Sequence, residues 1–182
     1  MKKFTIYKMT TTHKIKLATA NDVELLALLG RVTFRESHGN YIEDKTNLDE
    51  YLNKAFSFET TQKEVNDSNN VYFIIYKNNF PVGYSKLVLN ATSPFLPDKR
   101  SCRLERIYIL EEFISQKFGI ELLNKTIKKA QELNFEVIWL SVYIKNTKAI
   151  NFYLKNDFEE VGSISFKISK QGYENPILAK KL

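Results

Sequence analysis

The chain has 182 residues, a formal net charge of +6 and one cysteine. This length fits one domain with its own core. A single cysteine excludes a disulfide within the chain, which favours a reducing compartment. No run is apolar enough for a signal peptide or a transmembrane helix, so we expect a cytoplasmic protein with no membrane partner. The basic residues are scattered, which argues against a nucleic-acid partner, and no His/Cys spacing indicates a metal.

The first third of the chain reads as a short strand followed by helices. Residues 15–17 alternate as a strand does, and residues 1–14 are expected to be an N-terminal extension, with the domain itself over 15–182. A capping-box spacing between Asn21 and Glu24 predicts a helix start. The residues at helical spacing behind it are Leu25, Leu28, Leu29 and Val32. Further helices are expected over 46–55 and about 58–65.

The middle of the chain is rich in β-branched and aromatic residues, which is typical of strands. Strands are expected over 71–76, about 81–90 and 102–110. A turn at 77–79 joins the first two, and a loop with two prolines over 91–100 joins the others. Connections this short favour antiparallel neighbours.

The last third alternates helix and strand. A helix is expected over 119–133, a strand buried on both faces over 137–142, a short helix over 147–155 and a strand over 158–166. An edge strand at 177–179 could support a homodimer. The sequence therefore predicts an α/β fold of the α+β type: one domain, with a mixed, mostly antiparallel sheet of about 6–7 strands flanked by helices.

The first candidate site lies where the third strand passes through the linker 111–118 into a helix. Free N–H groups and the dipole at a helix start favour phosphate. Gly119 would let a ligand approach the backbone closely, and Ser115, Gln116 and Lys117 add donors. An ordinary strand-to-helix loop has the same pattern, so this pattern alone does not distinguish a phosphate-binding loop from an ordinary one.

The second candidate site opens the short helix after the buried strand. Asn146 could cap that helix or hold a ligand amide, and Tyr153 carries a phenol that can give a proton. The alternative is that Phe152 and Tyr153 are core aromatics. Cys102 has no nearby histidine and is expected to fill the core rather than to act as a nucleophile.

Together these patterns resemble the GNAT acetyltransferases, from about Ile15 to Lys180. The most specific parts are the run 104–109, the helix from Gly119 and the spacing Asn146, Ala149, Phe152-Tyr153, Phe158. Within that superfamily the chain is most similar to the PaiA-type spermidine/spermine N-acetyltransferases. The segments that carry this closer similarity are 17–19, 33–34, 82–87 and 137–142.

The resemblance implies transfer of an acetyl group from acetyl-CoA to a primary amine of a small molecule, with a polyamine as the candidate, by direct attack in a ternary complex. It implies that Glu105 acts through water as a base and that Tyr153 protonates the departing thiolate. It also implies a set of residues that contact acetyl-CoA: Ile107, Tyr108, Ile109, the pyrophosphate loop Ile114, Ser115, Gln116, Lys117, Phe118 and Gly119, and then Asn146, Ala149 and Tyr153.

One departure from the family pattern lies in the pyrophosphate loop, where Ile114 replaces a polar residue and Lys117 replaces a glycine. Lys117 could supply a charge to the pyrophosphate, or a bulkier loop could weaken cofactor binding. A salt bridge to a lysine is the alternative role for Glu105. His38 is expected to be an ordinary surface or loop histidine.

The sequence gives the least information about the acceptor amine. Acidic residues after the first helix could attract a polycation or could simply be solvated: Glu36, Glu43, Asp44, Asp49 and Glu50. The main alternative to polyamine acetylation is acetylation of another acceptor, such as an amino acid, an antibiotic or a protein amine. The second alternative is a non-catalytic domain that binds acyl-CoA.

Overall fold

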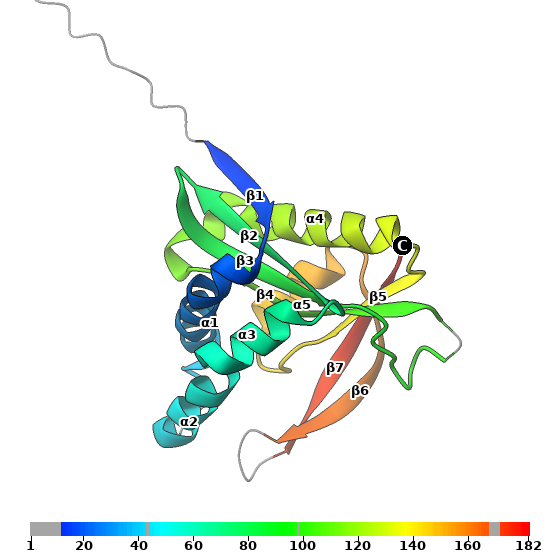
Figure 1. Ribbon diagram of the computed structural model, residues 1–182. Helices are drawn as coiled ribbons and strands as arrows, with labels where there is room; N and C mark the ends of the chain where they lie inside the picture. Colours follow the sequence, from blue (N-terminus) through cyan, green and yellow to red (C-terminus); the bar gives the residue numbers. More distant parts are fainter. Residues whose placement is uncertain (1–11, 43, 98, 168–171) are drawn as a thin grey trace, which may run out of the picture.

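The computed structural model describes residues 12–42, 44–97, 99–167 and 172–182. Its centre is a seven-stranded sheet with the strand order β1-β2-β3-β4-β5-β7-β6. Helices α1 to α3 lie on one side of this sheet, and the long helix α4 lies on the other (Figure 1). The fold class expected from the sequence is confirmed. Residues 1–11, most of the expected N-terminal extension, lie outside the described residues.

The strands and helices follow the predicted order, with ends that differ by a few residues. The strands are β1 His13–Leu17, β2 Asn70–Lys77, β3 Phe80–Val88, β4 Ser101–Ile109, β5 Val137–Ser141, β6 Glu159–Lys167 and β7 Gly172–Lys181. The α-helices are α1 Val23–His38, α2 Lys45–Ala55, α3 Phe58–Asn66, α4 Phe118–Glu132 and α5 Thr147–Leu154. Two 3-10 helices precede α1 and α4: η1 Ala20–Asp22 and η2 Glu111–Gln116.

The start of α1 differs from the sequence prediction. The capping box is formed by Thr19 and Asp22, where the Thr19 N–H donates to Asp22 Oδ2 at 2.8 Å, and not by Asn21 and Glu24. The buried face of α1 also differs from the expected one. Leu26 and Leu29 are buried, whereas Leu28, which we expected on the buried face, is 60% exposed. Val32, expected on the same face, is exposed too.

The expected edge strand at 177–179 is also wrong. Strand β7 lies between β5 and β6, pairs antiparallel with both, and buries Ile177 to 1% exposure. The reason is that β6 and β7 form a hairpin whose second strand, β7, pairs with β5, which leaves the first strand, β6, at the edge of the sheet. The argument for a homodimer through this strand therefore fails.

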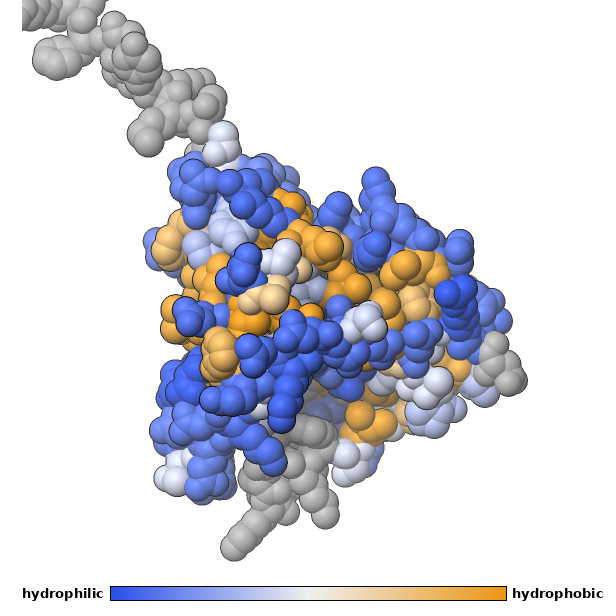
Figure 2. Space-filling model, in the orientation of Figure 1, coloured by the Kyte–Doolittle hydropathy of each residue, from blue (hydrophilic) through white to orange (hydrophobic). Residues whose placement is uncertain are grey.

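The largest core cluster lies between the sheet and the α4–α5 side. Leu123 of α4, Ile138 of β5 and Leu178 of β7 are all fully buried there. Cys102 belongs to the same cluster, and burial raises the pKa of its thiol to about 12, so the prediction of a core filler is confirmed. The opposite side is more polar: Figure 2 shows hydrophilic residues covering α2 and α3.

A buried hydrogen bond ties α4 to the middle of the sheet. Ser85 Oγ of β3 and Thr126 Oγ1 of α4 are 2.8 Å apart, and both residues are 0% exposed. Thr126 Oγ1 also donates to the Leu122 carbonyl at 2.8 Å. Because α4 carries the candidate phosphate loop at its start, this contact helps to fix the position of that loop.

We expect Thr126→Val to lower the free energy of unfolding by about 1–3 kcal/mol, because it leaves the Ser85 hydroxyl buried without its partner. The double variant Ser85→Ala/Thr126→Val should lose less, because both polar groups are then gone. Urea denaturation of the three proteins measures the difference. A double variant less stable than Thr126→Val would contradict this account.

Candidate active site

The two central parallel strands separate partway along their length. Strand β4 pairs with β5 at only three positions, from Ser101 with Val137 to Arg103 with Trp139. Its other edge stays paired with β3 as far as Ile109. Among the described residues, β4 from Leu104 to Ile109 therefore has no strand on its β5 side. This leaves an open edge of backbone groups in the middle of the sheet.

A β-bulge marks the point where the strands part. Lys86 of β3 pairs with Arg106 and Leu87 pairs with Leu104, so Glu105 is the extra residue on β4. A bulge bends its strand and redirects the side chains beside it, and bulges are common next to active sites. The predicted base thus lies at the junction of the two strands.

The register of β3 and β4 decides which peptide groups face the open edge. The Leu110 N–H donates to the Val82 carbonyl at 2.9 Å, so Leu110 points toward β3. Peptide groups alternate between the two edges of a strand, so those of Ile107 and Ile109 point toward the gap. Tyr108, also predicted to contact the cofactor, has its peptide on the β3 side. Its ring packs near Phe34 of α1, at 6.2 Å between centroids.

The predicted phosphate loop is an exposed turn at the start of α4. Ile114 is 63% exposed, and Ser115, Gln116 and Lys117 are exposed as well. Lys117 has φ 66° and ψ 4°, the left-handed conformation that favours glycine, and α4 begins at the next residue. Lys117 therefore adopts the backbone conformation that suits the glycine expected at this position from the family pattern.

A second lysine lies beside this turn. Lys77, at the end of β2, donates from Nζ to Gln116 Oε1 at 2.7 Å. Strand β2 thus brings a cation to the start of α4, although Lys77 and Gln116 are 39 residues apart in the sequence. The sequence analysis missed Lys77 because this contact depends on the hairpin bringing β2 next to η2.

Gly119 leaves room at the open edge. A Cβ built there would lie 3.9 Å from Phe152 Cζ and 4.0 Å from Ile109 Cγ1, in ordinary van der Waals contact. Packing within the protein does not require a glycine at this position. Gly83 differs, because a Cβ there would come within 2.5 Å of the Tyr108 carbonyl oxygen. Gly119 thus lies next to both the open edge of β4 and α5, and the unpaired peptide groups of β4 are of the kind that would hold the amides of the pantetheine arm of acetyl-CoA.

Helix α5 closes the other side of the gap. Asn146 Oδ1 accepts from the Ala149 N–H at 3.1 Å and caps the helix, one of the two roles expected for it. Tyr153 is 8% exposed, and its ring lies 5.5 Å from that of Phe158. Tyr153 is therefore a core aromatic as well as a candidate acid.

The phenol of Tyr153 lies close enough to that of Tyr108 for the two groups to interact electrostatically. Burial, followed by the nearby phenol of Tyr108, raises the pKa of Tyr153 above its ordinary value. The Tyr153 phenol therefore stays protonated at neutral pH. A group from the α4–α5 side and a group from the α1 side thus come together where β4 and β5 separate.

Glu105 belongs to a ring of buried charges that the sequence analysis did not foresee. Lys86 Nζ lies 2.8 Å from Glu64 Oε1 and 2.6 Å from Glu105 Oε2, and its side chain is 5% exposed. Arg106 donates to both Glu64 oxygens, at 2.7 and 3.2 Å, and lies 3.8 Å from Glu105. The salt bridge to a lysine considered for Glu105 is present, and the role of Glu105 as a base stays a prediction.

Glu64 of α3 is the centre of this ring. Burial by itself raises the pKa of Glu64, but the charge of Arg106 and hydrogen bonds from Lys86 and Tyr72 outweigh it, so the pKa lies below its ordinary value. Glu64 is thus ionised at neutral pH and compensates the two cations. Nothing local in the sequence around Glu64 signals this role, because its partners are on β2, β3 and β4.

Most of the acids that could attract a polycation are engaged within the fold. Asp44 accepts from the N–H groups of Thr46 and Asn47 and caps α2. Asp49 pairs with Arg35, and Glu36 accepts from the Glu111 N–H at 2.9 Å. Glu43 lies outside the described residues, and Glu50 is exposed.

His38 differs from the surface residue that we expected. Its ring stacks on Phe34 at 4.3 Å between centroids, beside Tyr108. Burial lowers the pKa of His38 to about 4, so the imidazole is neutral at pH 7. His38 therefore belongs to an aromatic cluster at the end of α1, near the charged ring.

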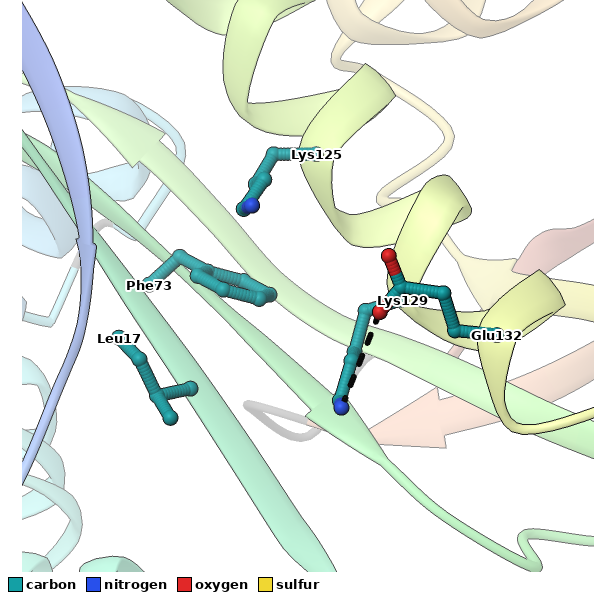
Figure 3. A pocket seen from close by; sticks show the side chains of 5 residues that line it. All are labelled: Leu17, Phe73, Lys125, Lys129 and Glu132. Atoms are coloured by element: carbon teal, nitrogen blue, oxygen red, sulfur yellow. Dashed lines mark ion pairs between the residues drawn. The ribbon is translucent and has the colours of Figure 1, made fainter.

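A hollow of about 180 Å³ lies elsewhere, between α4 and the strands β1 and β2. Lys125 and Lys129 of α4 face Phe73 and Leu17 across it, with Glu132 at its end (Figure 3). It contains none of the predicted site residues. Over the ranges described, no cluster of three His, Cys, Asp or Glu side chains is arranged to hold a metal, and none of the helices is long and apolar enough to cross a membrane.

Comparisons with known proteins agree with this arrangement. The sequence profile of the acetyltransferase (GNAT) family matches residues 35–158, more than half of the chain. A relative from Lactobacillus delbrueckii subsp. lactis, described as an uncharacterized N-acetyltransferase in the pepI 3′ region, is 23% identical over 93% of this chain and 97% of its own length.

Solved structures share the fold. The PaiA N-acetyltransferase from Thermoplasma acidophilum, crystallised with coenzyme A, has a TM-score of 0.77 at 18% identity, covering 94% of this chain and 99% of that one. Mutant forms of the spermidine/spermine N-acetyltransferase SpeG from Vibrio cholerae have a TM-score of 0.65 at 18% identity, covering 93% of each chain. From the separated strands, the bulge and the profile match, we conclude that this chain is an enzyme of the acetyltransferase (GNAT) family.

Proposed function

We propose that the enzyme binds acetyl-CoA in the gap between β4 and β5 and transfers its acetyl group to a primary amine of a small molecule. The observation that carries this proposal is the open edge of β4, where the peptide groups of Ile107 and Ile109 face the space beside Gly119. The coenzyme A complex of the Thermoplasma PaiA protein, which shares this fold, supports it.

The start of α4 suits the pyrophosphate. Its free N–H groups and dipole favour an anion, and the exposed Lys117 and the half-buried Lys77 add positive charge. The peptide groups of Ile107 and Ile109 would hold the pantetheine arm as a neighbouring strand would. Bound acetyl-CoA supplies an activated thioester, and an N–H group at the open edge would stabilise the negative charge that forms on its carbonyl oxygen.

An attacking amine must be neutral, and a primary amine with a pKa near ~10.4 is almost fully protonated at pH 7. Glu105, at the bulge, is our candidate to accept that proton through a water molecule. Tyr153 stays protonated and is our candidate to donate a proton to the departing sulfur. Attack occurs directly in a ternary complex, because Cys102 is buried in the core and cannot form an acyl-enzyme.

A polyamine acceptor remains a prediction that rests on likeness. The SpeG protein is a spermidine/spermine N-acetyltransferase by its description, and the sequence resembles PaiA-type enzymes. The acids first thought to attract a polycation give little support, because Asp44, Asp49 and Glu36 already have partners within the fold. The cytoplasmic location also stays a prediction.

Calorimetric titration with acetyl-CoA, followed by a thiol-release assay against a panel of amines, tests the proposed function. We expect binding in the micromolar range and thiol release that depends on the amine. If acetyl-CoA binds but no amine in the panel causes thiol release, the enzymatic proposal is contradicted. No binding would show that Ile114 and Lys117 have abolished the cofactor site.

Lys117 offers a test that separates charge from backbone conformation. We expect Lys117→Ala and Lys117→Gly to weaken acetyl-CoA binding equally and in a salt-dependent way, because both lose the charge. The glycine variant should be about 1 kcal/mol more stable than the alanine variant, since φ is 66° there. Calorimetry and urea denaturation measure the two effects. Lys128→Ala, an exposed change on the same helix, is the control, and unchanged binding in both Lys117 variants would remove Lys117 from the site.

Tyr153→Phe should lower turnover about 10²-fold while binding acetyl-CoA normally, because the ring still fills the core but the phenol is lost. Because the raised pKa keeps the phenol protonated, we expect no loss of wild-type activity up to about pH 10 from its ionisation. Steady-state rates against pH measure both effects, with Tyr76→Phe on β2 as a matched control. Unchanged turnover in Tyr153→Phe would exclude the acid role.

A further inference from the structure

We propose that the acceptor amine carries an anionic group, a carboxylate or a phosphate, which binds to Arg103 beside Glu105. This inference rests on the proposed function, since it names the class of acceptor for the same site. It is carried by the contacts of Arg103, which differ from those of the other cations around Glu105.

Arg103 is the one cation of this group whose guanidinium is not engaged in a close ion pair. Its nearest carboxylate among the described residues is Glu105, at 3.8 Å from Nη1 to Oε1, too far for a hydrogen bond. Its Nε is buried and has no hydrogen-bond partner within the described part of the chain. Lys86 and Arg106 differ, because each lies within 2.8 Å of a carboxylate oxygen.

Packing nevertheless holds Arg103 in place. Its guanidinium carbon lies 5.1 Å from the centre of the Trp139 ring, the residue with which it pairs in the parallel register of β4 and β5. Trp139 is itself fixed, because its Nε1–H donates to the Ala91 carbonyl at 2.8 Å. Stacking on an aromatic ring leaves the hydrogen-bonding edge of a guanidinium available for a planar or tetrahedral anion. The side chain is 35% exposed, so a ligand can reach it.

The local charge balance favours the same class of ligand. Three cations, Lys86, Arg103 and Arg106, surround two carboxylates, Glu64 and Glu105. Among the described residues this group therefore has one more positive than negative charge, and Arg103 is its cation without a close carboxylate partner. A polycation would meet this charge as repulsion, whereas an anionic group would neutralise it and fill the empty donors.

The positions of Arg103 and Glu105 define the geometry of the acceptor. They are separated by one residue on β4, and their charged groups approach within 3.8 Å. An amine held near Glu105 with its anionic group on Arg103 must therefore have the two groups a few bonds apart. An α-amino acid fits this description, and so does a short amine that carries a phosphate.

The first experiment measures turnover with matched acceptors at saturating acetyl-CoA. The pairs are α-amino acids against their amides, and phosphoethanolamine against ethanolamine, with spermidine alongside. We expect kcat/KM to be about tenfold higher for the anionic member of at least one pair. The pair with the larger ratio of anionic to neutral kcat/KM shows whether the site prefers a carboxylate or a phosphate. Equal values within every pair, or a preference for spermidine, would overturn the proposal.

The second experiment needs no turnover and so separates this proposal from the proposed function. Trp139 is the one tryptophan of the chain, so its fluorescence reports on the ring against which Arg103 stacks. Each compound is titrated into the enzyme with coenzyme A in place of acetyl-CoA. We expect a saturable change with the anionic member of a pair and a much weaker one with its neutral counterpart. If no compound gives such a change, the anion subsite is wrong even where thiol release proceeds.

Variants locate the effect on Arg103. Arg103→Gln should reduce the preference for the anionic member to near unity, mainly through KM, and Arg103→Lys should retain part of it because the charge remains. Arg100→Gln, an equal loss of charge three residues earlier on the same chain segment, should keep the wild-type preference. Melting temperatures and acetyl-CoA affinity show that each variant is folded. A preference that survives in Arg103→Gln would assign the anion to another group and overturn the proposal.

Discussion

The separation of β4 from β5 is the constraint on which the rest of the site depends. The two strands share three residue pairs, which is enough to align them in one sheet but leaves the second half of β4 open. Unpaired peptide groups in the middle of a sheet are costly unless something satisfies them. A ligand with amide groups of its own can do so as a substitute strand, which explains how one interrupted ladder produces a binding site without any special side chain.

The same separation connects the two faces of the sheet. Tyr153 approaches from the α4–α5 side, while Tyr108, Glu105 and the charged ring belong to the α1–α3 side. In an intact sheet these groups would be divided by a layer of paired backbone. In the proposed function, a thioester enters this gap from one face and meets an amine from the other. The bulge at Glu105 adds to this arrangement because it turns the strand at the junction.

The charged ring on the α1–α3 side buries several charges, which costs stability unless each charge is paired. A buried lysine such as Lys86 is tolerated only because Glu64 and Glu105 both lie within 2.8 Å of it. Glu64 belongs to α3, which lies far in the sequence from the predicted cofactor-binding residues. Through Lys86, this helix helps to hold the candidate base Glu105 in place. Because Lys86 and Arg106 pair with Glu64 and Glu105, the acidic residue at the bulge does not by itself give the ring a net negative charge.

The sequence alone determined the family features that depend on local pattern. Alternating apolar runs predicted the strands, the strand-to-helix junction predicted a phosphate site at α4, and Asn146 predicted a helix cap that the structure confirms. Only the tertiary structure decided the contacts between distant segments: the place of β7 inside the sheet, the ring around Glu64 and the stacking of Arg103 on Trp139. The physical reason is that periodicity and capping act over a few residues, whereas strand order and ion pairing depend on which segments the fold brings together.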